Sequence, residues 1–165
     1  MVNILDKVQP KNKAQLAQLI YYAFKHNIYD LNFIDTSKIT DMCWLFRYND
    51  YNFDVSGWDV SNVTNMSAMF YYCKNFDCDL SNWDVSNVTN TAGMFYYCKK
   101  FDCDLSCWNV SNVTYMEYMF TGCEKFNCDL SDWDISNITH WRNMFSRCDK
   151  MTIPNWYKKL YIVKK

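Results

Sequence analysis

Hydrophobic and polar residues follow one pattern that recurs every 25 residues along most of the chain. Trp58, Trp83, Trp108 and Trp133 mark the period, and almost every residue type around them recurs in step. The stretch from Phe76 to Lys100, FDCDLSNWDVSNVTNTAGMFYYCKK, is one complete unit. Self-similarity at a period of this length is typical of an array of stacked repeats.

The first part of each unit has the spacing of a strand. Phe76, Cys78 and Leu80 alternate with aspartates, so that one face is apolar and the other acidic. After a Ser-Asn break, Trp83 and Val85 continue the alternation. The pattern therefore predicts two short strands joined by a tight turn.

The second part of each unit has the spacing of a short helix. Its apolar residues recur at i, i+3, i+4 and i+7, and a threonine stands at the expected N-cap. The four sets are Thr64, Met66, Met69, Phe70 and Cys73; Thr89, Met94, Phe95 and Cys98, with Thr91 in place of the first Met; Thr114, Met116, Met119, Phe120 and Cys123; and Thr139, Trp141, Met144, Phe145 and Cys148. Phe33 to Val55 is a degenerate first copy.

Strands and a helix in every 25 residues predict an α/β repeat, a leucine-rich-repeat-like right-handed solenoid of about five coils. A single coil cannot bury enough apolar surface to fold alone, so both ends need caps. We expect one domain over 1–165, with an N-terminal helical cap over 1–30, repeats over 31–150 and a C-terminal cap over 151–165.

Pro10 to Asn27 predicts one amphipathic helix for the first cap. Its rival interpretation is a basic helix for a membrane or nucleic acid, for which it has only three lysines.

The tail from Met151 to Lys165 begins as a further coil, with Met151 and Ile153 at strand positions. Pro154 removes a backbone donor, which suits the edge of a sheet. We expect the following Asn-Trp-Tyr-Lys-Lys segment to close the apolar end.

The motif DLSNWDVSNVTN, followed by MF and a cysteine, and the opening PKNKAQLAQLI resemble the BspA-like family of leucine-rich-repeat surface proteins, in its Trp-Asp-Val-Ser-Asn-Val-Thr variant. The resemblance covers nearly the whole chain. It implies binding rather than catalysis, often adhesion to host proteins at a microbial cell surface. Cysteine replaces a polar family residue at Cys78, Cys103 and Cys128. The chain also shows no signal peptide, and both departures favour an intracellular location.

Nine cysteines make the chain cysteine-rich. Seven of them fall into two columns, and Cys43 and Cys107 stand apart. The columns are Cys73, Cys98, Cys123 and Cys148 at the helix position, and Cys78, Cys103 and Cys128 at the strand position. We interpret them as small buried hydrophobes in a reducing compartment. Alternatives are disulfides along a ladder, and a metal-binding or redox-responsive role.

Acidic and amide side chains form three further columns. The Trp-Asp column is interpreted as turn residues that bond to the backbone. The other two columns predict an exposed acidic face, with calcium binding as the alternative. Residues 50–134 carry thirteen acidic and four basic side chains, which the formal net charge of −1 conceals. The Trp-Asp column is Asp59, Asp84, Asn109 and Asp134; the others are Asp54, Asp79, Asp104 and Asp129, and Asn52, Asp77, Asp102 and Asn127.

These patterns predict a non-catalytic protein-binding chain that needs no cofactor or metal. Its two histidines, His26 and His140, are isolated, and no nucleophile elbow or phosphate loop is present. The expected partner is another protein, such as a host or matrix protein; no nucleic acid or membrane insertion is expected. Tyrosines add area at low entropy cost. The predicted partner-binding residues are Asp77, Asp79, Asp102, Asp104, Asn127, Asp129, Tyr72 and Tyr97.

Overall fold

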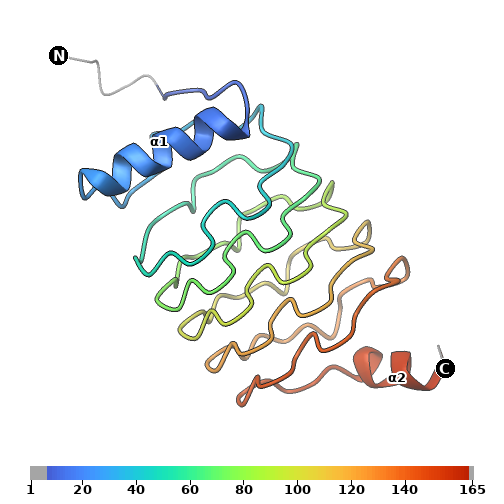
Figure 1. Ribbon diagram of the computed structural model, residues 1–165. Coiled ribbons are helices and arrows are strands. Elements are labelled where there is room, and N and C mark those ends of the chain that lie inside the picture. The colour runs from blue at the N-terminus through green and yellow to red at the C-terminus, as the bar shows by residue number, and fades with distance from the viewer. Residues whose placement is uncertain (1–6, 164–165) are drawn as a thin grey trace.

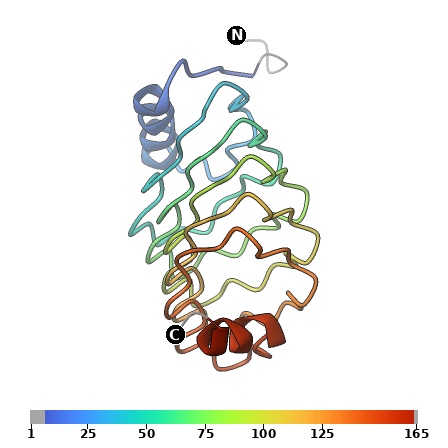
Figure 2. The same ribbon diagram turned by 90° about the vertical axis from the view of Figure 1, so that its right-hand side faces the viewer.

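The computed structural model describes residues 7–163, which wind into a stack of coils between two helices (Figure 1). Helix α1 spans Lys13–Lys25 and helix α2 spans Asn155–Val163. They lie at opposite ends of the stack, α1 against the first coil and α2 against the last (Figure 2). The amphipathic helix predicted within residues 10–27 is confirmed, since α1 buries Leu16, Ile20 and Ala23.

The predicted α/β, leucine-rich-repeat-like right-handed solenoid is wrong. Between α1 and α2 the described coils contain no helix and no strand of a sheet; they consist of turns and isolated parallel bridges. The bridges join one residue of each coil to the next, in the series Asp41, Asn65, Asn90, Tyr115 and His140.

Left-handed residues explain why the predicted helices are absent. Two residues per coil, four positions apart, have φ between 52° and 75°, whereas an α-helix needs negative φ throughout. They are Trp44 and Tyr48; Ala68 and Tyr72; Gly93 and Tyr97; Tyr118 and Gly122; and Asn143 and Arg147. A succession of turns with a four-residue period brings the same apolar residues to one side as a helix does, so the spacing alone did not separate the two.

Hydrogen bonds in these turns alternate between two directions. The amides of Met69, Tyr71 and Cys73 bond to carbonyls three residues earlier in the same coil. The amides of Met66, Ala68, Phe70 and Tyr72 bond to the next coil, at 2.7–2.9 Å. A helix would use all of these donors internally, whereas the turns leave four of the seven to join the next coil.

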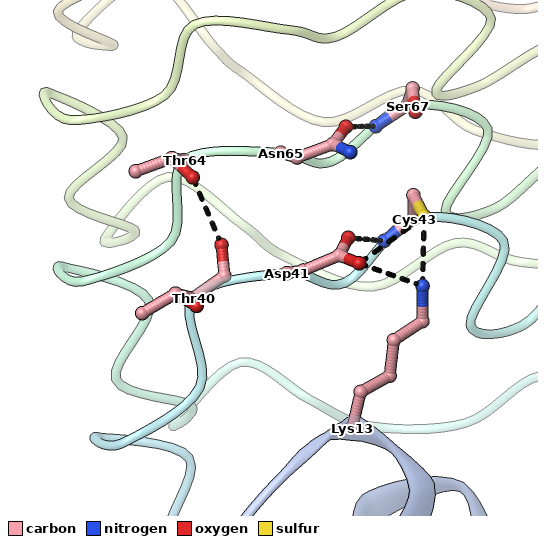
Figure 3. Close-up of polar contacts among 7 residues, drawn as sticks. All are labelled: Lys13, Thr40, Asp41, Cys43, Thr64, Asn65 and Ser67. Carbon is pink, nitrogen blue, oxygen red and sulfur yellow. Dashed lines mark hydrogen bonds and ion pairs between the residues drawn. The ribbon is translucent and has the colours of Figure 1, made fainter.

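The threonines at the expected N-cap positions also join neighbouring coils by hydrogen bonds. The backbone amide of Thr64 donates to the carbonyl of Thr40 at 2.8 Å. The Thr64 hydroxyl donates to the same oxygen at 3.2 Å (Figure 3). Thr89, Thr114 and Thr139 repeat both bonds on the preceding threonine. The predicted role as helix caps is therefore wrong.

Aromatic columns fill the core. Phe70, Phe95, Phe120 and Phe145 stack in nearly parallel planes, with centroids 5.5–5.8 Å apart. Each repeat tryptophan donates its indole N–H to a carbonyl of the preceding coil at 3.0–3.2 Å, from Trp58 on Leu31 to Trp133 on Leu105. Such bonds let a large apolar ring be buried without leaving its N–H unpaired.

The C-terminal tail closes the stack as a helix rather than as a further strand. Trp156, in the first turn of α2, donates its indole N–H to the carbonyl of Leu130 at 2.7 Å and so continues the tryptophan column. Phe145 contacts both Trp156 and Tyr157. The prediction that this segment covers the apolar end is confirmed, whereas its strand positions at Met151 and Ile153 are not.

Candidate functional site

Three open grooves run side by side between coils on one acidic face. The first, of about 420 Å³, is lined by Asp30, Asn52, Asp54, Asp77 and Asp79 among others. The second, also about 420 Å³, lies between the Asp77–Asp79 and Asp102–Asp104 segments. The third, about 280 Å³, lies between Asp102–Asp104 and Asn127–Asp129. The structure thus brings together all six acidic and amide residues of the predicted face, and all six are exposed.

The two columns on this face do different things. Asp79, Asp104 and Asp129 each accept a hydrogen bond at 2.9 Å from the backbone amide of the serine two residues later. Hydrogen bonds from these serines lower the pKa of the three carboxyl groups below its ordinary value. These aspartates therefore hold turns, as the Trp-Asp column does at Asp59 and Asp84, where the prediction is confirmed.

The outer column is more available to a ligand. Asp102 accepts one bond at 3.2 Å from the backbone amide of Asn127 in the next coil. The Asp77 carboxylate makes no hydrogen bond or ion pair within residues 7–163. Its charge is left to water or to a partner.

Cysteines lie between the two acidic columns. The thiols of Cys78, Cys103 and Cys128 approach the turn aspartate of the preceding coil at 3.3–3.6 Å. Cys103 and Cys128 also accept backbone N–H bonds at 3.1 Å, from Leu80 and Leu105. Burial raises the pKa of all three thiols to about 12. They remain protonated at neutral pH and act here as hydrogen-bonding groups.

The other cysteine column is buried. Cys73, Cys98, Cys123 and Cys148 each direct the thiol at the carbonyl of a phenylalanine in the preceding coil, at 2.8–3.0 Å. All nine cysteines are free. Among the described residues, no group of three or more histidine, cysteine or acidic side chains is arranged to hold a metal ion.

Tyr72 and Tyr97 do not line the acidic grooves. Their rings stack on each other with centroids 5.0 Å apart and an interplanar angle of 2°. Arg147 donates a hydrogen bond to the Tyr97 hydroxyl and lies over its ring. The sequence grouped these tyrosines with the aspartates, but the structure places them in a separate aromatic column.

Sequence reasoning missed a further groove, of about 660 Å³, which is lined by aromatic side chains. Trp44, Tyr71, Tyr96 and Tyr118 line it together with Glu117. The Glu117 Oε2 atom is buried without a hydrogen-bond partner. The one available signal was that Glu117 breaks its column, which contains Ser67 and Ala92 in the two preceding coils.

Comparison with known proteins gives a family but no described activity. No curated protein and no solved structure matches the chain. Neither helix in the part of the chain that the structure describes is long and apolar enough to cross a membrane. One family model matches the chain twice, over residues 14–112 and 86–161, and so covers most of its length. The chain therefore belongs to the family that is described as Mycoplasma protein of unknown function, DUF285.

Proposed function

We propose that this chain is a non-catalytic binding protein that recognises a basic segment of another protein through its acidic face. The observation that carries the proposal is the alignment of three acidic grooves on one face, with Asp77 and Asp102 exposed along their rims. Carboxylates repeated at the coil spacing repel each other and gain free energy when a cation approaches. An extended segment rich in lysine or arginine fits this geometry.

The resemblance to BspA-like surface proteins supports adhesion as the setting, with a host or matrix protein as the partner. Thirteen acidic against four basic side chains in residues 50–134 would steer a basic partner toward this face.

A binding measurement with a matched pair of variants tests the proposal. The probes are a lysine-rich peptide and a set of purified extracellular-matrix proteins, offered to the immobilised chain. The groove variant is Asp77→Lys with Asp102→Lys, because neither carboxylate holds a turn in its own coil. The control is Asp132→Lys with Asp149→Lys, which changes the net charge equally at exposed sites outside the grooves.

We expect the groove variant to bind at least roughly 10-fold more weakly and the control to bind within about 2-fold of the unmodified chain at 0.15 M salt. Equal losses in both variants would mean that net charge alone attracts the probe. Retention of no probe by the unmodified chain would reject the proposed partner class.

A further inference from the structure

A lysine, an aspartate and a cysteine meet where α1 packs against the first coil (Figure 3). The Nζ atom of Lys13, in the first turn of α1, lies 2.8 Å from the Cys43 Sγ atom and 3.2 Å from Asp41 Oδ2. Asp41 also accepts the backbone N–H of Cys43 at 2.8 Å, and its Oδ2 atom lies 3.5 Å from Sγ. The three side chains form a single cluster.

The fold does not need a cysteine or a charge at this point. Asn65 and Ser67 occupy the same positions in the next coil and close the same turn, with Asn65 Oδ1 accepting the Ser67 N–H at 3.0 Å (Figure 3). Asn90 and Ala92 close it in the coil after that, at 2.9 Å. Asp41 and Cys43 thus replace the Asn-x-Ser/Ala pair of the next two coils where Lys13 of α1 reaches the coil.

Cys43 also differs from the other eight cysteines. The seven columnar thiols face carbonyl or carboxylate oxygens, and Cys107 faces the carbonyl of Ser81. Cys43 also lies near a carboxylate, that of Asp41, but it alone has a cationic amine within hydrogen-bond distance of its sulfur. The cluster is accessible to dissolved oxidants, since the side chains of Lys13 and Asp41 are 35% and 46% exposed and Cys43 is half-buried.

The separation of nitrogen and sulfur suits one bridging atom. A direct bond would bring the atoms far closer than 2.8 Å. Two single bonds of about 1.5 Å or slightly more, meeting at a tetrahedral angle, span roughly 2.5–2.8 Å.

We propose that Lys13 and Cys43 are an oxidative modification site, at which dioxygen joins them through a nitrogen–oxygen–sulfur bridge that fastens α1 to the first coil. Asp41 holds the Lys13 side chain beside the thiol through the ion pair. The ammonium group first loses a proton to solvent, which frees the lone pair of the amine. The S–H bond, one N–H bond and the O–O bond then break. N–O and O–S bonds form, and the second oxygen atom leaves as water with the two hydrogens. Sulfur and nitrogen are oxidised and dioxygen is reduced. Two molecules of a dithiol supply the four hydrogens that later restore the amine and the thiol and release the bridging oxygen as water.

The experiment compares full-length protein incubated in air-saturated buffer with the same sample treated with a dithiol. After proteolysis, mass spectrometry should find the Lys13 peptide joined to the Cys43 peptide, with two hydrogens lost and one oxygen gained. The product should disappear on reduction. It should persist in Cys107→Ser and Lys11→Arg, and be absent from Lys13→Arg and Cys43→Ser.

Two further readouts separate the bridge from incidental oxidation. Asp41→Asn keeps the turn acceptor that Asn65 provides in the next coil but removes the ion pair that positions Lys13, and should slow bridge formation roughly 10-fold or more. The thermal midpoint should fall on reduction of the unmodified chain but not of Lys13→Arg. A Cys43 that stays fully alkylatable after oxidation, or that yields only a disulfide, a sulfinic acid or a direct sulfur–nitrogen link, would overturn the proposal.

Discussion

Exposed side chains of this protein make many of the hydrogen bonds that hold its turns. Asp54, Asp79 and Asp84 each fix a turn by accepting the amide of the serine two residues later, at 2.8–3.0 Å. This role was predicted for the Trp-Asp column, because Asp and Asn side chains commonly bond to the backbone of turns. It was missed for Asp79, because alternation with Cys78 and Leu80 suggested an outward-facing strand residue.

Replacing Asp79 tests this role. Asp79→Ala removes the acceptor for Ser81 N–H and should lower the free energy of unfolding by about 1 kcal/mol. Asp79→Asn keeps an acceptor oxygen and should stay within about 0.5 kcal/mol. Urea titrations at neutral pH give both values, with Asp132→Ala as an exposed control. Equal losses in the Ala and Asn variants would show that the charge rather than the turn bond is stabilising.

Thiol reactivity should divide the cysteines by environment. Burial raises the pKa of Cys73 and Cys148 to about 12 and that of Cys98 and Cys123 well above its ordinary value. In the reduced folded chain an alkylating reagent at neutral pH should modify exposed Cys107 and half-buried Cys43 first. The four buried thiols should react only after unfolding. Labelling of Cys98 as fast as Cys107, followed by peptide mass spectrometry, would contradict this arrangement.

At the scale of the element, α1 could be predicted from the sequence but the turns of the coils could not. A spacing of i, i+3, i+4 and i+7 identifies residues that share one side of the chain. In α1 no hydrogen bond to a neighbouring coil competes with the backbone bonds of the helix, so the apolar stripe correctly predicts a helix. In the coils the same spacing coexists with amides that bond to the next coil, as Ala68 does to Ala92 at 2.8 Å. Those bonds depend on stacked copies, which no single 25-residue window contains.

Gly93 and Ala68 occupy equivalent left-handed positions in successive coils, with φ of 60° and 52°. Gly93→Ala should therefore destabilise the chain by about 1 kcal/mol, and Ala68→Gly should stabilise it by up to a similar amount. In a helix both signs would be reversed, because alanine is about 1 kcal/mol better than glycine there. Space is not the obstacle at Gly93, where an added Cβ meets nothing closer than 3.7 Å.

Chemical denaturation of the two variants measures both changes. Ala92→Gly serves as the control. Because Ala92 does not have a left-handed backbone, glycine at this position should destabilise the chain. A stabilising Gly93→Ala would reinstate the helical interpretation of these segments.

Over the whole molecule the sequence predicted the repeat, the two caps and the acidic face, because each follows from periodicity or composition. It did not predict contacts that occur once, such as Lys13 with Cys43 and the aromatic groove beside Glu117. These depend on how close in space two segments lie that are separate in the sequence. The places where a repeat is broken are therefore the best signal for such contacts.

Two effects of opposite sign determine how the free energy of unfolding changes as the pH falls. Hydrogen bonds lower the pKa of the turn aspartates below the ordinary value of 3.8; they are Asp54, Asp79, Asp84, Asp104, Asp129 and Asp134. A carboxyl whose pKa is lower when folded stabilises the fold above its unfolded pKa, and this contribution is lost as the pH falls through the folded pKa. Repulsion among the acidic columns acts oppositely, since protonation relieves it.

Salt separates the two effects, because it screens exposed charges over about 8 Å at 0.15 M but leaves hydrogen bonds in place. At that salt concentration we expect the free energy of unfolding, measured by urea titration, to change little from pH 7 to about pH 5 and to fall below about pH 4. A variant with asparagine at Asp54, Asp79 and Asp84 keeps the acceptors and should show a shallower fall. Stability that rises on acidification in high salt would mean that these carboxylates do not hold the coils in their charged form.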